Sequence, residues 1–209
     1  MARYPAEHKE ATRARILAAS ERILKRDGFD GASIEAVMRA AGMTVGGFYA
    51  HFASKEDLSR QALLYSVEQS FARLTEGLER VDDRTFLRTL IERYLAQAED
   101  PALEHACPLT LLLPEVARGD ASFRAEFAHR TARLVQAVEA RFPEAPGGTR
   151  RETALGVFAA LSGAVAMARA AATPAARRKI AQATGRLLCT ALGLDRPARH
   201  AAIKSRRAS

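Results

Sequence analysis

Hydroxyl side chains stand at the starts of three predicted helices, where they could meet phosphate groups. They belong to Ser33, Thr44 and Ser54. The first turn of a helix leaves backbone N–H groups unpaired and carries a partial positive charge, which attracts anions. Lys55 follows the last of these hydroxyls and places a side-chain charge near the same helix end. This arrangement predicts contacts with the phosphates of a polyanion.

Cys107 is at the centre of the one cluster that could support nucleophilic or metal chemistry. Its neighbours in the sequence are His105, Glu115 and, further on, His129. Residues two apart on a helix point to different sides, so His105 and Cys107 would need a loop to act together. The sequence shows no nucleotide-binding loop, metal-ligand spacing or catalytic triad. We therefore expect no catalytic residue, metal or cofactor, and Cys107 is a thiol sensor, a pocket-lining residue or a small buried apolar residue.

The stretch 33–52 contains the elements that would position these hydroxyls. Ser33 suits the N-cap of a short helix whose apolar residues recur at helical spacing. Gly42 supplies the left-handed backbone that ends this helix, and Thr44 opens a second short helix. Two helices this short cannot bury themselves, so they need neighbouring helices. The pattern predicts a helix-turn-helix, whose second helix can enter the major groove of DNA.

Predicted helices on both sides complete this unit. A polar arm of residues 1–10 precedes a helix over residues 11–27, and Phe29 follows as a plug for the small core. Beyond the helix-turn-helix, Ser54 and Asp57 form a start that resembles a capping box. The long helix that follows carries apolar residues at steps of three and four: Leu64, Val67, Phe71, Leu74 and Leu78. It leaves the DNA-reading unit, so it can connect that unit mechanically to the rest of the chain.

The rest of the chain is also predicted to be helical. Further helices are expected over residues 85–98, 120–142, 149–172 and 174–192. Residues 107–116 form an apolar segment broken by two prolines, which indicates two short helices or one kinked helix. The predicted fold class is all-α, with an N-terminal three-helix helix-turn-helix DNA-binding domain at residues 1–53, a C-terminal helical ligand-binding and dimerisation domain at 54–195, and a basic tail at 196–209.

Composition favours a soluble protein that contacts a polyanion. The 209 residues carry a net charge of +8, although most of the excess lies in residues 141–209 and does not locate the DNA site. The longest uncharged apolar stretch, between Glu152 and Arg169, is shorter than the ~20 residues of a membrane span. The sequence shows no secretory signal, and Cys107 and Cys189 lie far apart. We therefore expect a cytoplasmic protein with no membrane partner.

Between about Thr12 and Leu63 the sequence resembles the TetR-like (tetracycline-repressor) family of transcriptional regulators. The motifs that carry the resemblance are Arg15-Ile16-Leu17 with Ala19, Gly28-Phe29, Ala32-Ser33-Ile34, Ala41-Gly42-Met43-Thr44, Gly47-Phe48-Tyr49-Ala50-His51-Phe52 and Ser54-Lys55-Glu56-Asp57-Leu58. The resemblance implies phosphate contacts from Ser33, Tyr49, His51 and Lys55. It implies base-edge contacts from the start of the recognition helix, that is from Thr44, Val45, Gly46, Gly47 and Phe48. The alternative is that Phe48, Tyr49 and Phe52 fill the small core.

One position departs from the family, which often has Lys, Arg or Pro where this chain has Gly46. Because Gly46 and Gly47 offer no side chain, this helix cannot recognise guanine through a bidentate Arg or Lys. Thr44, the methyl groups of Val45 against thymine, and DNA shape are expected to carry the specificity. Each glycine also weakens the short helix by roughly 1 kcal/mol relative to alanine, which favours full ordering only on DNA.

The second half of the chain is expected to bind a small molecule in an apolar cavity. Reading DNA needs only the first helices and a dimer contact, which leaves more than half of the chain for another task. Pro108 and Pro114 interrupt regular helix packing, so space is expected beside them. The predicted lining residues are Leu90, Tyr94, Cys107, Leu109, Leu112, Phe127 and Phe158, which favour an apolar or aromatic ligand.

The last two predicted helices could form a dimer interface. The first of them carries the small residues Gly156, Ala159, Ala160, Gly163 and Ala164, which allow close approach of another helix. The second contributes Ile180, Leu187, Leu188 and Ala191. Pairing between two copies would give a four-helix interface, as the family forms, whereas the alternative is packing within one chain.

These features together predict a homodimeric regulator that binds a palindromic operator in double-stranded DNA. Its most direct form is a repressor that a small apolar or aromatic molecule releases from the operator. The alternative is a thiol-sensing regulator that acts through Cys107. Two further alternatives are an enzyme that uses His105, Cys107 and Glu115, and a constitutive DNA-packaging protein.

Overall fold

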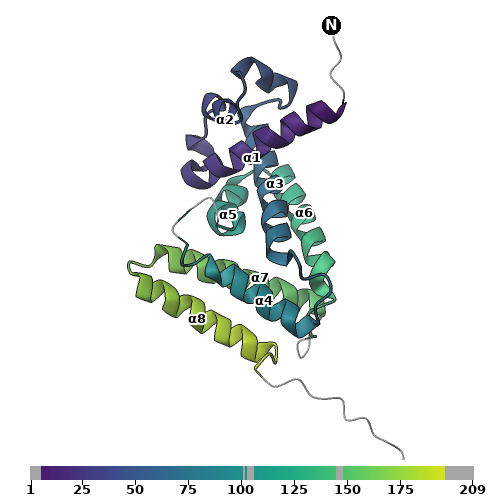
Figure 1. The fold of residues 1–209 in the computed structure, drawn as a ribbon, viewed down its shortest axis with the longest axis vertical. Helices are drawn as coiled ribbons and strands as arrows, with labels where there is room; N and C mark the ends of the chain where they lie inside the picture. Colours follow the sequence, from purple (N-terminus) through teal and green to yellow (C-terminus); the bar gives the residue numbers. More distant parts are fainter. Residues whose placement is uncertain (1–5, 101, 103–105, 145–147, 196–209) are drawn as a thin grey trace, which may run out of the picture.

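Helices form all the regular structure in the part of the chain that the structure describes, as the sequence predicted (Figure 1). The structure is a computed structural model, and it describes residues 6–100, 102, 106–144 and 148–195. The elements are α1 (Ala6–Gly31), α2 (Ile34–Ala40), the 3-10 helix η1 (Val45–Ala50), α3 (Lys55–Thr75), α4 (Asp83–Ala96), α5 (Pro108–Arg118), α6 (Ala121–Glu139), α7 (Arg150–Ala170) and α8 (Pro174–Ala191).

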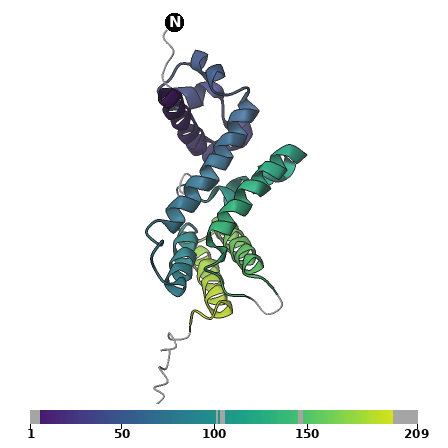
Figure 2. The ribbon, with the colours of Figure 1, turned by 90° about the vertical axis from the view of Figure 1, so that its right-hand side faces the viewer.

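The helices form two groups that α3 connects. In Figure 1, α1 and α2 lie at one end of the molecule, and α4, α7 and α8 lie together at the other end. Figure 2 shows α3 running from the first group into the second. This agrees with the prediction that the long helix links the DNA-reading unit to the rest of the chain.

Side-chain caps fix the starts of the helices around the turn. Ser33 Oγ accepts the backbone N–H of Ala36 at 3.1 Å, and Ser54 Oγ accepts that of Asp57 at 3.1 Å. The Asp57 carboxylate reaches back to the N–H of Ala53 at 3.0 Å, one residue before the N-cap. The start of α3 is therefore held from both sides, as in a capping box.

The start of the chain differs from the prediction, because α1 begins at Ala6 and not at residue 11. Residues 6–10 are therefore helical and do not form a loose arm; residues 1–5 lie outside the described part. Near its other end, α1 is kinked at Gly28, whose φ of 72° places it in the left-handed region that favours glycine. The kink brings Phe29 against Phe123 of α6, with ring centroids 6.5 Å apart.

The expected recognition helix is also different, since residues 45–50 form a 3-10 helix rather than an α-helix. Gly46 and Gly47 lower helix stability, and Thr44 makes no side-chain hydrogen bond that would cap the element. The turn before it is regular: Gly42 has φ of 69°, and Arg15 of α1 donates to the carbonyl of Ala41 at 2.8 Å. This hydrogen bond ties the turn to α1.

The proline-containing segment forms the single helix α5. Pro108 lies in the first turn, where its missing N–H would have no partner, so it starts the helix and does not break it. Only Pro114 lies inside the helix. Asp120 then caps α6 by accepting the N–H of Phe123 at 2.8 Å, as predicted.

Two clusters of buried apolar side chains hold the helices together. The first core joins α1, α2, η1 and the first part of α3, and it also includes Leu112, Val116 and Phe123 from α5 and α6. The second core joins the end of α3 with α4, α7 and α8. Helix α5 therefore contributes to the core that supports the helix-turn-helix, which its position in the sequence did not predict.

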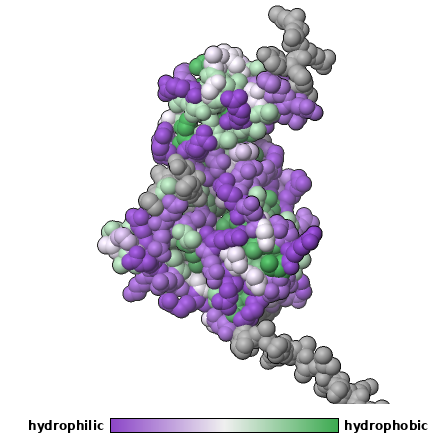
Figure 3. All heavy atoms as spheres, in the orientation of Figure 1, coloured by the Kyte–Doolittle hydropathy of each residue, from purple (hydrophilic) through white to green (hydrophobic). Residues whose placement is uncertain are grey.

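Helix α7 has the length and apolar composition of a membrane-spanning helix. The uncharged stretch within it, between Glu152 and Arg169, is shorter than the ~20 residues of a membrane span, as the sequence indicated. The apolar part of α7 is 39% buried inside the molecule, and core helices of soluble proteins share this length and composition. Figure 3 shows hydrophilic residues over most of the visible face, with small hydrophobic patches among them.

Candidate nucleic-acid interface and ligand cavity

The helix-turn-helix presents one aromatic side chain to solvent and buries two others. Tyr49 is 70% exposed, while Phe48 and Phe52 are buried in the first core. The rings of Phe48 and Tyr49 meet edge to face, with centroids 5.1 Å apart. The buried Phe48 ring therefore packs against Tyr49. Its side chain cannot contact a base edge, so the prediction of a base contact for Phe48 is wrong.

The other predicted DNA-binding residues lie at or near the surface of the same unit. Ser33, Thr44, Val45 and Gly46 are exposed, and Gly47, His51 and Lys55 are partly buried. A side chain added at Gly46 would meet nothing within 4 Å, so this position leaves open space in front of the recognition element. Thr44 and Val45 are therefore the exposed side chains at the start of this element.

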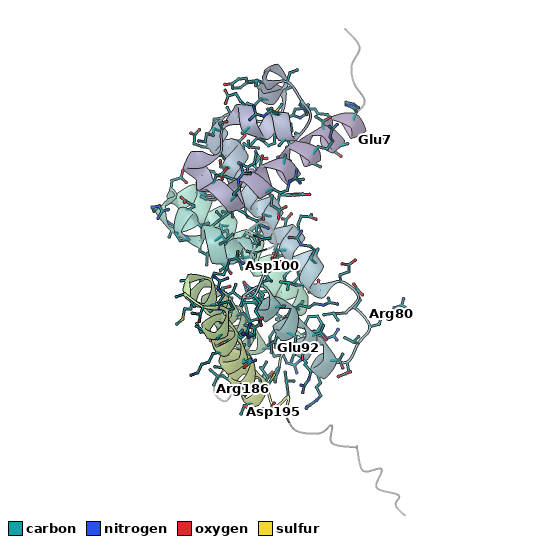
Figure 4. The ribbon with its side chains drawn as sticks, turned by 60° about the vertical axis from the view of Figure 1, so that its left-hand side comes forward. Glu7, Arg80, Glu92, Asp100, Arg186 and Asp195 are labelled. Atoms are coloured by element: carbon teal, nitrogen blue, oxygen red, sulfur yellow. The ribbon has the colours of Figure 1, made fainter. Side chains whose placement is uncertain are left out.

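Basic residues of α1 add charge to this surface. Figure 4 shows Glu7, at the start of α1, at the same end of the molecule as the helix-turn-helix. Burial first, and then the charges of Lys9 and Arg13, lower the pKa of His51 below its ordinary value. The Arg13 guanidinium also lies over the Phe52 ring, 5.3 Å from its centroid.

These two basic residues were missed from the sequence, because Lys9 was assigned to a loose arm and Arg13 was not placed next to the recognition element. Lys9 and Arg13 are four residues apart and so share one face of α1. They form a cationic pair beside His51, whose buried Nδ1 has no hydrogen-bond partner and whose lowered pKa favours the neutral ring. Such a group can contact DNA phosphates.

A cavity of about 560 Å³ lies among α3, α4, α5, α6 and α7. Its size is within the range of about 300–1,000 Å³ that is usual for small-molecule sites. The side chains that line it are mostly apolar. They are Val67, Ser70, Phe71, Leu74, Tyr94, Cys107, Leu109, Thr110, Leu113, Pro114, Phe127, Thr131, Leu134, Val135, Leu155, Phe158, Ala159, Ser162, Gly163 and Ala166.

Five of the seven residues predicted to line a pocket border this cavity, namely Tyr94, Cys107, Leu109, Phe127 and Phe158. The predictions for Leu90 and Leu112 are wrong. Leu90 is fully buried in the second core, and Leu112 points into the first core. Both are buried apolar residues on helices that border the cavity, but their side chains pack in the cores and not against the cavity.

The cluster proposed around Cys107 is dispersed in the described part of the chain. Cys107 is buried at the N-terminal end of α5, where its N–H donates to Gln97 Oε1 at 2.6 Å. Glu115 pairs with Arg118 at 3.0 Å, and His129 is exposed on α6. His105 lies outside the described residues. Among the described residues, no three metal-binding side chains come together.

Helix α5 borders both the cavity and the first core. Thr110, Leu113 and Pro114 line the cavity. Leu112 and Val116, on the same helix, pack in the first core under the helix-turn-helix. A ligand that displaces α5 would therefore also press on the core that positions the recognition element.

The outer faces of α7 and α8 expose apolar and small residues. Leu155, Met167 and Leu187 are exposed, and a side chain added at Gly156 or Gly163 would meet nothing within 4 Å. Leu155 and Gly163 also border the cavity, which is open at this side of α7. Figure 4 labels Arg186, which is also exposed on α8. Of the residues predicted for a dimer interface, Ala164 and Leu188 are buried in the chain's own core, and Ile180 packs against it. The small-residue face is therefore narrower than predicted.

Comparison with known proteins places the first part of the chain in a known group. Residues 16–62 match a family model described as bacterial regulatory proteins of the tetR family. The chain is 37% identical over 70 residues to the HTH-type transcriptional regulator UidR of Escherichia coli K12, a match that covers 34% of this chain and 36% of that protein. The chain thus aligns with little more than a third of the length of this relative.

Solved structures resemble the chain over most of its length. A TetR transcriptional regulator from Chloroflexus aurantiacus J-10-FL is 25% identical, with a TM-score of 0.62, and the match covers 87% of this chain and 96% of that one. A transcriptional regulator from Saccharomonospora viridis, solved in complex with choline, is 20% identical, with a TM-score of 0.67 and coverage of 86% and 96%. At 20% identity, the similarity to the Saccharomonospora viridis protein shows that the two chains share a fold.

Proposed function

We propose, from the premise that the N-terminal domain of this chain is that of the tetR family of bacterial regulatory proteins, that the protein is a ligand-responsive transcriptional regulator. In its most direct form it is a cytoplasmic repressor that leaves its operator when a small molecule binds. The family match supports the DNA-binding part of this proposal. The cavity supports the ligand-binding part.

The DNA-binding surface combines phosphate contacts with a small base-reading element. Tyr49, His51 and Lys55, with Lys9 and Arg13 from α1, would contact phosphates and set the orientation on the duplex. Thr44 and Val45 are the exposed side chains that would reach base edges. With glycine at the next two positions, DNA shape would contribute a larger share of the specificity.

Helix α5 is the observation that carries the ligand-responsive part. Its residues Thr110 and Leu113 border the cavity, while Leu112 and Val116 belong to the first core. Packed interiors do not deform continuously, so filling the cavity favours one of a few discrete positions of α5. A ligand that binds one position better shifts the population toward it.

A homodimer would place two recognition elements on one operator. Gly156 and Gly163 are exposed on α7, where Gly163 also borders the cavity, and Leu187 is exposed on α8. Pairing of these faces between two copies would bury them in a four-helix interface. Half-sites would then lie about 34–36 Å apart, or a multiple of this, in a palindromic operator.

The test uses the DNA that flanks the protein's own coding region. Fluorescence anisotropy with the full-length chain would locate one palindromic site that is bound with a strong salt dependence. Metabolite fractions would then be screened for loss of binding. Equal affinity for the operator and for scrambled DNA would contradict the proposal. So would a fraction that fills the cavity but leaves operator affinity unchanged.

Thiol sensing through Cys107 is the second candidate. Cys107 is 3% exposed and lines the cavity, so an electrophile or oxidant that enters the cavity would reach its thiol. A reagent that alters operator binding of the wild type but not of Cys107→Ala would support this candidate. Equal responses of the two proteins would leave reversible ligand binding as the mechanism.

A further inference from the structure

The cavity lining contains hydroxyl groups but no charge. Among the described residues that border the cavity, none is Asp, Glu, Lys, Arg or His. An ion moved into such a space loses its hydration and gains no partner of opposite charge. Charged groups of a ligand are therefore disfavoured inside the cavity, whatever the shape of its apolar part.

Three of the hydroxyl groups gather at one place. Tyr94 of α4 and Ser162 of α7 are both more than nine-tenths buried, and their oxygens lie 2.8 Å apart. Burial, and then the neighbouring Cys107 thiol, raise the pKa of the Tyr94 phenol far above its ordinary range, so Tyr94 stays protonated. Thr110 of α5 is beside this pair, and its buried Oγ1 makes no hydrogen bond of ordinary geometry.

These groups leave hydrogen-bond donors available inside the cavity. One proton of the Tyr94–Ser162 pair is used between the two oxygens, and the Thr110 hydroxyl, close to the Tyr94 phenol, makes no hydrogen bond of ordinary geometry. A buried polar group without a partner is unfavourable, so an oxygen atom of a ligand would be stabilised there. The Thr131 hydroxyl differs, because it donates to the Phe127 carbonyl of its own helix at 2.8 Å.

Aromatic rings form much of the remaining lining. Phe71, Phe127 and Phe158 border the cavity, and the rings of Phe71 and Phe158 lie 6.3 Å apart. Their surfaces favour a flat apolar or aromatic body. The polar group and the apolar walls thus specify two different parts of one ligand.

We propose that this cavity takes an uncharged ligand with an apolar or aromatic body, and that a single carbonyl or hydroxyl oxygen of the ligand binds at Tyr94, Ser162 and Thr110. This inference rests on the proposed function in naming the class of effector. It excludes carboxylates and ammonium compounds as ligands that bind through their charge. It also gives Tyr94 and Thr110 defined roles as donors to the ligand oxygen.

Four fluorescent probes of matched shape test the proposal on the full-length protein: 1-pyrenemethanol, 1-pyrenecarboxylate, 1-pyrenemethylammonium and 1-methylpyrene. The alcohol is expected to bind at least about tenfold more tightly than either ion. The hydrocarbon is expected to bind, but less tightly than the alcohol. Equal or tighter binding of either ion, or no binding of any probe, would overturn the proposal.

Side-chain variants locate the polar group. Thr110→Val, which keeps the shape of the side chain, and Tyr94→Phe should each weaken binding of the alcohol by about three- to tenfold and leave binding of 1-methylpyrene unchanged. Thr131→Val is the matched control, since that hydroxyl lines the same cavity and is already used. Equal losses in Thr110→Val and Thr131→Val would contradict the assignment.

Operator binding separates this inference from the proposed function. If the alcohol fills the cavity selectively but leaves operator affinity unchanged, the ligand class is correct and the regulatory proposal fails. If a carboxylate or an ammonium compound fills the cavity and releases the operator, the regulatory proposal stands and the ligand class is wrong.

Discussion

Arg60 and Asp120 form an ion pair, with 2.5 Å between Nη2 and Oδ2, that joins α3 to the start of α6. Asp120 also caps α6, and hydrogen bonds from the Phe123 N–H and from Arg60 lower the pKa of its carboxyl group. The Arg60 guanidinium lies over the Phe123 ring, 5.2 Å from its centroid, and Phe123 belongs to the first core. The helix that leaves the helix-turn-helix is thus tied to the helices that border the cavity.

Arg60→Gln should weaken this connection without removing either binding site. We compare operator affinity with and without 1-pyrenemethanol in the cavity. In Arg60→Gln, the ratio of these two affinities should be about two- to fivefold smaller than in the wild type, while the affinity without ligand stays nearly constant. Arg118→Gln is the control, because Arg118 pairs only locally with Glu115 on α5 in the described ion pairs. Equal changes in the two variants would show that the pair does not transmit the effect.

Tyr49 and Lys55 should act as phosphate contacts. Tyr49→Phe and Lys55→Ala are expected to weaken operator binding and leave the helicity and the dimer unchanged, because both residues lie at the edge of the helix-turn-helix. Lys55→Ala should also lower the slope of log affinity against log salt by about one. Lys179→Ala, on exposed α8, serves as the control. Wild-type affinity in both variants at matched salt would refute the assignment.

His51 should make operator binding depend on pH. Its pKa is lowered in the free protein by burial and by Lys9 and Arg13, whereas nearby phosphates would favour the protonated form. Operator affinity should therefore rise as pH falls from about 8 to about 6. His51→Gln should flatten this rise, and His129→Gln, on exposed α6, should not. The same rise in all three proteins would exclude His51 as its source.

The same titration has the opposite sign for folding. The folded-state pKa of His51 lies below its ordinary value, so the unfolded chain binds more protons near and below that value. The stability associated with neutral His51 is present at higher pH and is lost as pH falls through the ordinary value of about 6.5. Denaturant titrations should show a smaller loss at low pH in His51→Gln than in the wild type.

The exposed face of α7 should form the dimer interface. Gly156 does not line the cavity, and leucine there has space within one chain, so Gly156→Leu should fold but hold two chains apart. Gly163→Leu should do the same, although it also adds a side chain at the border of the cavity. Sedimentation should then show monomers or aggregates, whereas Ala117→Leu, on exposed α5, should remain dimeric. A wild-type chain that is monomeric at micromolar concentration would disprove the interface, and dimeric leucine variants would place it elsewhere.

Local signals in the sequence predicted the helices well where caps are strong. Ser33, Ser54 and Asp120 mark helix starts because each satisfies a backbone N–H three residues later. No such cap marks the start of α1 among the described residues, and the sequence prediction began this helix at residue 11 instead of Ala6. Val45–Ala50 was expected to be α-helical, although its two glycines favour neither helix type strongly enough to decide.

Periodicity also predicted which residues are buried, but not what they pack against. Leu112 has the burial expected of a lining residue, yet it faces the first core because α5 lies between two apolar clusters. The position of Lys9 and Arg13 beside His51 depends on how α1 packs against the residues that follow η1, which is a tertiary contact. Five of the twenty residues that line the cavity could be named in advance, and three of these are aromatic, because few aromatic residues are available in the second half of the chain.

The most direct test of the account measures cavity occupancy and operator affinity in the same samples. 1-Pyrenemethanol is titrated into the full-length protein while its fluorescence and the anisotropy of labelled operator DNA are recorded. The account predicts that operator affinity falls with the same half-saturation as the cavity fills, and that Thr110→Phe, which fills part of the cavity, loses both responses but still binds the operator. A cavity that fills completely while operator affinity stays constant would contradict the claim that this cavity controls DNA binding.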